Sequence, residues 1–111
     1  MQHEPKKYLY DARCACDAIA QFTNGKTRDQ YMADPLLRSA VERQFEILGE
    51  AFSRLSALAP AYREQCPDMG KIIGMRNRII HGYDTVDNEI VWDAVTNHVS
   101  RLRDWIASTD T

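Results

Sequence analysis

The chain has 111 residues, a length that fits a single domain spanning residues 1–111 with a modest hydrophobic core. Hydrophobic residues make up 44% and charged residues 27%, which is the balance of a soluble globular protein. The formal net charge of −2 excludes the strongly basic class of nucleic-acid-binding proteins, and no apolar run approaches the roughly 20 residues that cross a bilayer. With no signal-peptide core either, we expect a cytoplasmic protein without membrane contact.

The apolar residues recur at spacings of three and four, which predicts helices and no strand of useful length. A first helix is expected over residues 6–22, ended by the turn that contains Gly25. Thr27 and Gln30 stand three apart, as in a capping box, and predict a short helix over residues 28–32.

The longest predicted helix covers residues 35–58 and starts after Asp34, because a capping Asp followed by Pro is a strong start signal. Gly49 in its middle costs about 1 kcal/mol relative to Ala, so we expect another backbone to approach closely there. The apolar stripe expected to face the core consists of Leu37, Val41, Phe45, Leu48, Phe52 and Leu55.

A connector with one helical turn is expected over residues 60–66, and Pro67 starts a further helix that ends near Gly82. Asp87 is expected to cap one last helix over residues 88–107. Four main helices with short connections predict an all-α fold, an antiparallel four-helix up-and-down bundle with one or two extra short helices.

Three cysteines, Cys14, Cys16 and Cys66, form no disulfide framework. Cys14 and Cys16 stand two apart on a predicted helix and therefore do not face each other. We expect reduced side chains that hold no metal.

Arg76 breaks the apolar stripe of the helix that starts at Pro67, because it stands where the pattern requires an aliphatic residue. An unpaired buried charge is costly, so Arg76 must be paired internally or reach an interface or cleft. Glu46 and Glu50 of the long helix are the candidate partners for a purely structural pair.

His81 follows Arg76 by five residues, which places the two side chains about 140° apart around a straight helix. Asn77 and His81 share a face, and Tyr83 aligns with Arg76 only if the helix continues through Gly82. Gly82 is suited to a left-handed helix cap. The candidate site therefore either straddles a helix end or is completed by two copies of the chain.

These residue types suit metal-free cleavage of RNA, with no cofactor. His81 could take the proton of the 2′-hydroxyl, a group that DNA lacks, and Arg76 could bind the charged phosphate oxygens. Asn77 is a candidate supporting residue, and Lys71 and Arg78 are candidate RNA contacts.

Residues 76–83 read RNRIIHGY, which resembles the signature of the HEPN superfamily: an Arg, four residues, a His, one residue and a Tyr. Two further stretches, residues 42–51 and 80–87, resemble the HepT-type toxin branch of that superfamily. The resemblance covers essentially the whole chain in length and helix order.

The resemblance implies a homodimeric all-α ribonuclease, independent of metal, that is the toxin of a toxin–antitoxin pair and acts on tRNA or mRNA. Arg76 and His81 of both chains would line a shared cleft. The antitoxin would be a minimal nucleotidyltransferase of the MntA type, which transfers AMP from ATP to the motif tyrosine, here Tyr83. The added phosphate would compete with RNA for Arg76.

Two other functions remain open at this point. The chain could be a non-catalytic substrate-binding subunit or antitoxin of a minimal nucleotidyltransferase. Alternatively, it could be a structural helical dimer in which Arg76 only pairs with a carboxylate.

Overall fold

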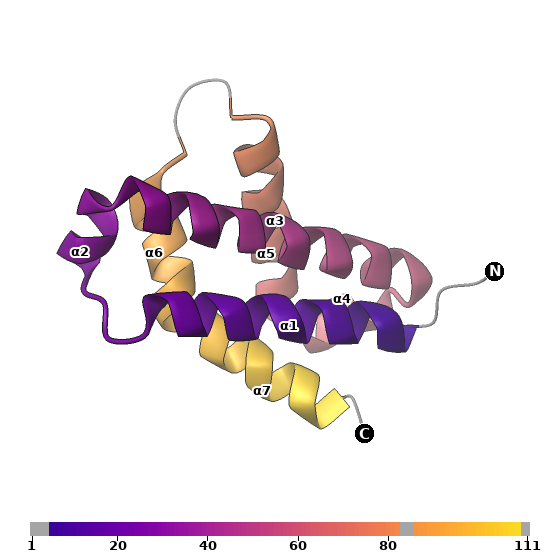
Figure 1. Ribbon diagram of the computed structural model, residues 1–111. Coiled ribbons are helices and arrows are strands. Elements are labelled where there is room, and N and C mark those ends of the chain that lie inside the picture. The colour runs from indigo at the N-terminus through magenta and orange to yellow at the C-terminus, as the bar shows by residue number, and fades with distance from the viewer. Residues whose placement is uncertain (1–4, 83–85, 110–111) are drawn as a thin grey trace.

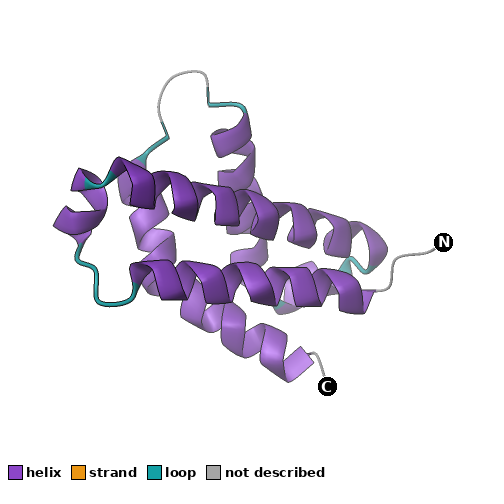
Figure 2. Ribbon diagram, viewed as in Figure 1, coloured by secondary structure: helices purple, strands orange, loops and turns teal. Residues whose placement is uncertain are grey.

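The structure is a computed structural model that describes residues 5–82 and 86–109. Every regular element in this part of the chain is an α-helix, which confirms the all-α class (Figure 2). The helices are α1 (Pro5–Thr23), α2 (Arg28–Ala33), α3 (Pro35–Leu58), α4 (Ala61–Gln65), α5 (Pro67–Ile80), α6 (Asn88–Asn97) and α7 (Val99–Thr109).

Side-chain caps start three of these helices at the predicted residues. The Thr27 hydroxyl accepts a hydrogen bond from the backbone N–H of Gln30, whose own side chain accepts from Thr27, so the capping box of α2 is complete. Asp34 caps α3 by accepting from the backbone N–H of Leu37. Asp87 caps α6 in the same manner. These local rules therefore fix where the helices begin.

Helices α1 and α3 lie side by side and antiparallel, and α5 and α6 cross this pair at a steep angle on one side (Figure 1). The C-terminal end of α5 extends beyond α3, and α7 turns back beneath α1. The crossing helices leave the four-helix up-and-down arrangement unconfirmed, although the predicted order of helices is confirmed from α1 to α5.

The core lies where α1 and α3 meet the crossing helices. All six residues of the stripe predicted for α3 are buried. Phe22 follows the buried Ile19 by three residues on α1, yet 37% of its surface is exposed one residue before the helix ends.

The single last helix predicted for residues 88–107 is wrong, because the chain bends at His98 and forms α6 and α7 (Figure 1). Asn97 is a weak helix former, and the Thr96 hydroxyl bonds to backbone carbonyls of the preceding turn. The half-buried ring of His98 contacts Asp68 at the start of α5, with 3.1 Å between Nδ1 and Oδ1. This contact ties the bend to the helix that carries Arg76.

Candidate functional site

Arg76 lies in α5 directly against Gly49 of α3. A Cβ atom added to Gly49 would be 2.3 Å from the Cβ and 2.7 Å from the Cγ of Arg76. The close approach predicted at Gly49 therefore exists, but the approaching group is the Arg76 side chain instead of another backbone. Only a glycine lets the two helices meet at this crossing.

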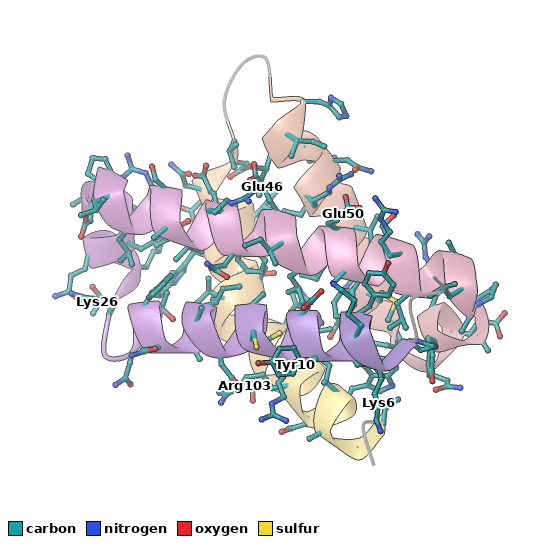
Figure 3. The ribbon with its side chains drawn as sticks, turned by 45° about the vertical axis from the view of Figure 1, so that its right-hand side comes forward. Lys6, Tyr10, Lys26, Glu46, Glu50 and Arg103 are labelled. Atoms are coloured by element: carbon teal, nitrogen blue, oxygen red, sulfur yellow. The ribbon has the colours of Figure 1, made fainter. Side chains whose placement is uncertain are left out.

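The guanidinium of Arg76 is paired, as its place in an apolar stripe requires. Its Nη2 donates to Oε1 of Glu50 at 2.5 Å, and its Nη1 donates to Oδ1 of Asn77 at 2.8 Å. Glu46, the other candidate partner, instead accepts from Arg43 at 3.0 Å. Figure 3 shows Glu46 and Glu50 on the same side of α3. Arg76 is 24% exposed, so its guanidinium reaches solvent beside its carboxylate partner.

Glu50 is shared between two arginines, because its Oε2 accepts a hydrogen bond from Nε of Arg54 at 2.8 Å. This hydrogen bond, together with the nearby charges of Arg76 and Arg54, lowers the pKa of Glu50 against the opposing effect of partial burial. Glu50 is therefore an anion at neutral pH and fixes the position of both guanidinium groups.

A hollow of about 570 Å³ opens over the outer face of α3, between α1 and α5. Arg76 and Ile80 of α5 form one side, and Ile47 and Ala51 of α3 contribute apolar surface. The charged and tyrosine residues that line it are Lys7, Tyr8, Asp11, Arg43, Glu46, Glu50, Arg54 and Arg76. Such a volume is within the usual range of ligand sites.

His81 lies at the C-terminal end of α5, where its backbone N–H donates to the carbonyl of Asn77 at 3.0 Å. Its side chain is exposed and has no hydrogen-bond partner among residues 5–82 and 86–109. It does not line the hollow that Arg76 lines. This separation agrees with the angle of about 140° expected for a spacing of five residues.

The other predicted site residues divide between the two flanks of α5. The Asn77 amide contacts Arg76, while its expected role in supporting His81 is untested. Lys71 and Arg78 line a smaller hollow of about 350 Å³ between α5 and α6. His81 follows Arg78 by three residues and therefore lies on the same flank of α5. Tyr83 lies outside the described residues.

Arg54 was not predicted as a site residue from the sequence, but in the structure it shares the Glu50 carboxylate with Arg76. The signal was present, because Arg54 follows Glu50 by four residues and such pairs meet on a helix surface.

No group of three or more His, Cys, Asp or Glu side chains in the described part of the chain is arranged to hold a metal ion. In the same residues, no helix has the length and apolar character that crossing a membrane requires.

Comparison with known proteins gives these residues a family. Residues 12–108 match the family model described as "Ribonuclease HepT-like". "Putative RNase MJ0127" of Methanocaldococcus jannaschii is 35% identical over 99 residues, which cover 86% of this chain and 81% of that protein. "Probable ribonuclease HepT" of Thermococcus cleftensis is 28% identical over 103 residues, 93% of each chain. No solved structure gives a significant match.

The chain belongs to the HepT-like ribonuclease family, a branch of the HEPN superfamily. Family membership and the names of these relatives support a ribonuclease activity.

Proposed function

We propose that this protein is a metal-independent endoribonuclease in which Arg76 and His81 act on the cleaved phosphate. The observation that carries the proposal is the arrangement of α5. Arg76 is fixed by Glu50 at the edge of a charged hollow, while His81 is exposed and unpartnered within the described residues. A fixed cation and an accessible imidazole are the two groups that cleavage through the 2′-hydroxyl needs.

In this mechanism His81 removes the proton of the 2′-hydroxyl, whose oxygen attacks the adjacent phosphorus. The bond from phosphorus to the 5′-oxygen breaks, which leaves a 2′,3′-cyclic phosphate and a 5′-hydroxyl. Arg76 stabilises the charge that develops on the non-bridging oxygens. The departing 5′-oxygen takes a proton from water.

The positions of the two residues support a site made by two chains. Arg76 faces α3, whereas His81 lies about 140° further around α5, away from the hollow that Arg76 lines. In a symmetric homodimer, Arg76 of one protomer and His81 of its partner can line the same cleft. Lys71 and Arg78, on the His81 flank, then contact the RNA backbone, for which tRNA or mRNA is the proposed substrate.

The proposed biological role is that of a cytoplasmic toxin neutralised by a nucleotidyltransferase antitoxin through adenylylation of Tyr83. Co-expression with an adjacent nucleotidyltransferase gene should add the mass of one or more AMP groups, and Tyr83→Phe should abolish the gain. No gain with an active nucleotidyltransferase would contradict this part of the proposal.

The ion pair between Arg76 and Glu50 also favours a second function, a structural helical dimer without catalysis. The Arg76→Met variant distinguishes the ribonuclease from the structural dimer. If the ion pair is only structural, Arg76→Met should keep the stability of the wild type, because such pairs are often replaced without loss of stability, and it should change no RNA-cleaving activity.

Cleavage of total tRNA by the purified protein in the presence of EDTA tests the proposed function. Arg76→Ala and His81→Ala should each lower kcat/KM by about 100-fold or more. Cleavage that survives both substitutions would contradict the assignment of the site.

A further inference from the structure

The Glu50 carboxylate bridges two guanidinium groups with one negative charge. One oxygen accepts from Arg76 at 2.5 Å and the other accepts from Arg54 at 2.8 Å. These three side chains together carry a net charge of +1. The bridge therefore leaves a local positive charge that an anion can neutralise.

The other charged side chains around the hollow do not supply that anion. Lys7 pairs with Asp11 at 2.7 Å, and Arg43 pairs with Glu46 at 3.0 Å. Each of these pairs is neutral, so the positive excess of the hollow lies at the Arg54 end of α3.

Arg54 has hydrogen-bond donors that its ion pair with Glu50 leaves unused. Its Nε donates to Glu50, and no hydrogen bond from its Nη1 or Nη2 to another described residue is found, although the nearby Tyr8 interacts with its charge. Its side chain is 63% exposed, so both groups face solvent over the hollow. A planar guanidinium with two free nitrogens matches two oxygens of a phosphate.

We infer that Arg54 is a substrate-binding residue that holds a backbone phosphate neighbouring the one cleaved at Arg76. The inference rests on the proposed ribonuclease function and extends its site from α5 across the outer face of α3. The small side chain of Ala51 and the half-buried Ile47 leave room for the strand between the two arginines.

The first test compares Arg54→Ala with Arg103→Ala in cleavage of a short synthetic RNA that spans a cleavage site mapped with the wild-type protein. Arg103 is the matched control, because it is also an exposed arginine paired with one carboxylate, Asp17, at 3.0 Å. Figure 3 places it beyond α1, on the side away from Glu50. Arg54→Ala should raise KM about 10-fold or more, whereas Arg103→Ala should match the wild type. Equal kinetics in both variants, with an active wild type, would overturn the inference.

The second test measures RNA binding in the His81→Ala background, where cleavage is removed. Each lost phosphate contact on a single strand lowers the salt dependence of log K by about 0.7. Adding Arg54→Ala should lower the slope by about this amount for each bound strand, and an unchanged slope would overturn the inference. This measurement remains informative if the wild type cleaves no RNA, a result that would contradict the proposed function alone.

The third test separates phosphate binding from a structural effect through Glu50. Neutral methylphosphonate linkages are placed one at a time within two nucleotides of the cleavage site. When the neutral linkage replaces the phosphate that Arg54 binds, the wild type and Arg54→Ala should cleave equally, because the contact between Arg54 and that phosphate is then absent from both. If Arg54→Ala keeps its full defect at every position, Arg54 acts only on the protein and the inference is wrong.

Discussion

Replacing Gly49 by Ala tests the packing that positions Arg76. The added Cβ would lie 2.3 Å from the Cβ of Arg76, about 1.1 Å short of the 3.4 Å at which ordinary contact begins. Helices α3 and α5 must therefore move apart or the Arg76 side chain must shift. Overpacking costs about 1–3 kcal/mol, and the better helix propensity of Ala offsets about 1 kcal/mol. We expect the free energy of unfolding to fall by about 0–2 kcal/mol.

The effect on activity should exceed the effect on stability, because a shift of about 1 Å in a catalytic group can cost on the order of 100-fold. Urea unfolding and RNA cleavage are measured on the same preparations. Gly74→Ala on α5 is the matched control, since a Cβ there meets nothing within 4 Å and should stabilise the helix by up to about 1 kcal/mol. If Gly49→Ala is as stable and as active as the wild type, the reasoning about this crossing is refuted.

The remaining predictions concern stability and metal dependence. The hydrogen bond from Arg101, followed by the charges of His98, Arg101 and Lys71, holds the pKa of Asp68 below its ordinary value of 3.8, although burial opposes this. Asp68 therefore stabilises the fold above that pH, and the benefit is lost as pH falls through the lowered pKa. Asp68→Asn should lower the free energy of unfolding at pH 7, and chemical unfolding at pH 7 and pH 3 should show the difference shrinking in acid. Asp87→Ala should cost about 1 kcal/mol by removing the cap of α6, with an unchanged midpoint arguing against that cap. Adding EDTA should leave the rate of RNA cleavage unchanged, and restoration by a divalent ion after its loss would contradict a metal-independent mechanism.

The helix starts could be predicted from sequence because their signals are local. Thr27, Asp34 and Asp87 each satisfy backbone N–H groups within three residues, so no distant contact is needed to place them. The bend at His98 could not be predicted in this way. It lies beside a contact with Asp68, thirty positions away in the chain, that appears only after the helices have packed.

The same distinction applies to the candidate site. Periodicity identified Arg76 as a charge in an apolar stripe, and helix geometry predicted its separation from His81. Sequence alone left Glu46 and Glu50 as equal partners, because both lie on the same side of α3. The crossing point at Gly49 decides between them, since it brings Arg76 beside Glu50.

The central claim, a cleavage site that two chains complete, is tested most directly by mixing two inactive variants. Arg76→Ala and His81→Ala proteins are unfolded together, refolded and assayed for RNA cleavage in EDTA. Half of the resulting dimers contain one chain of each kind, and each of these has one intact site made of Arg76 from one protomer and His81 from its partner. We predict recovery of about a quarter of the wild-type activity, with none in either variant alone. Mixed dimers that form but stay inactive would contradict the claim.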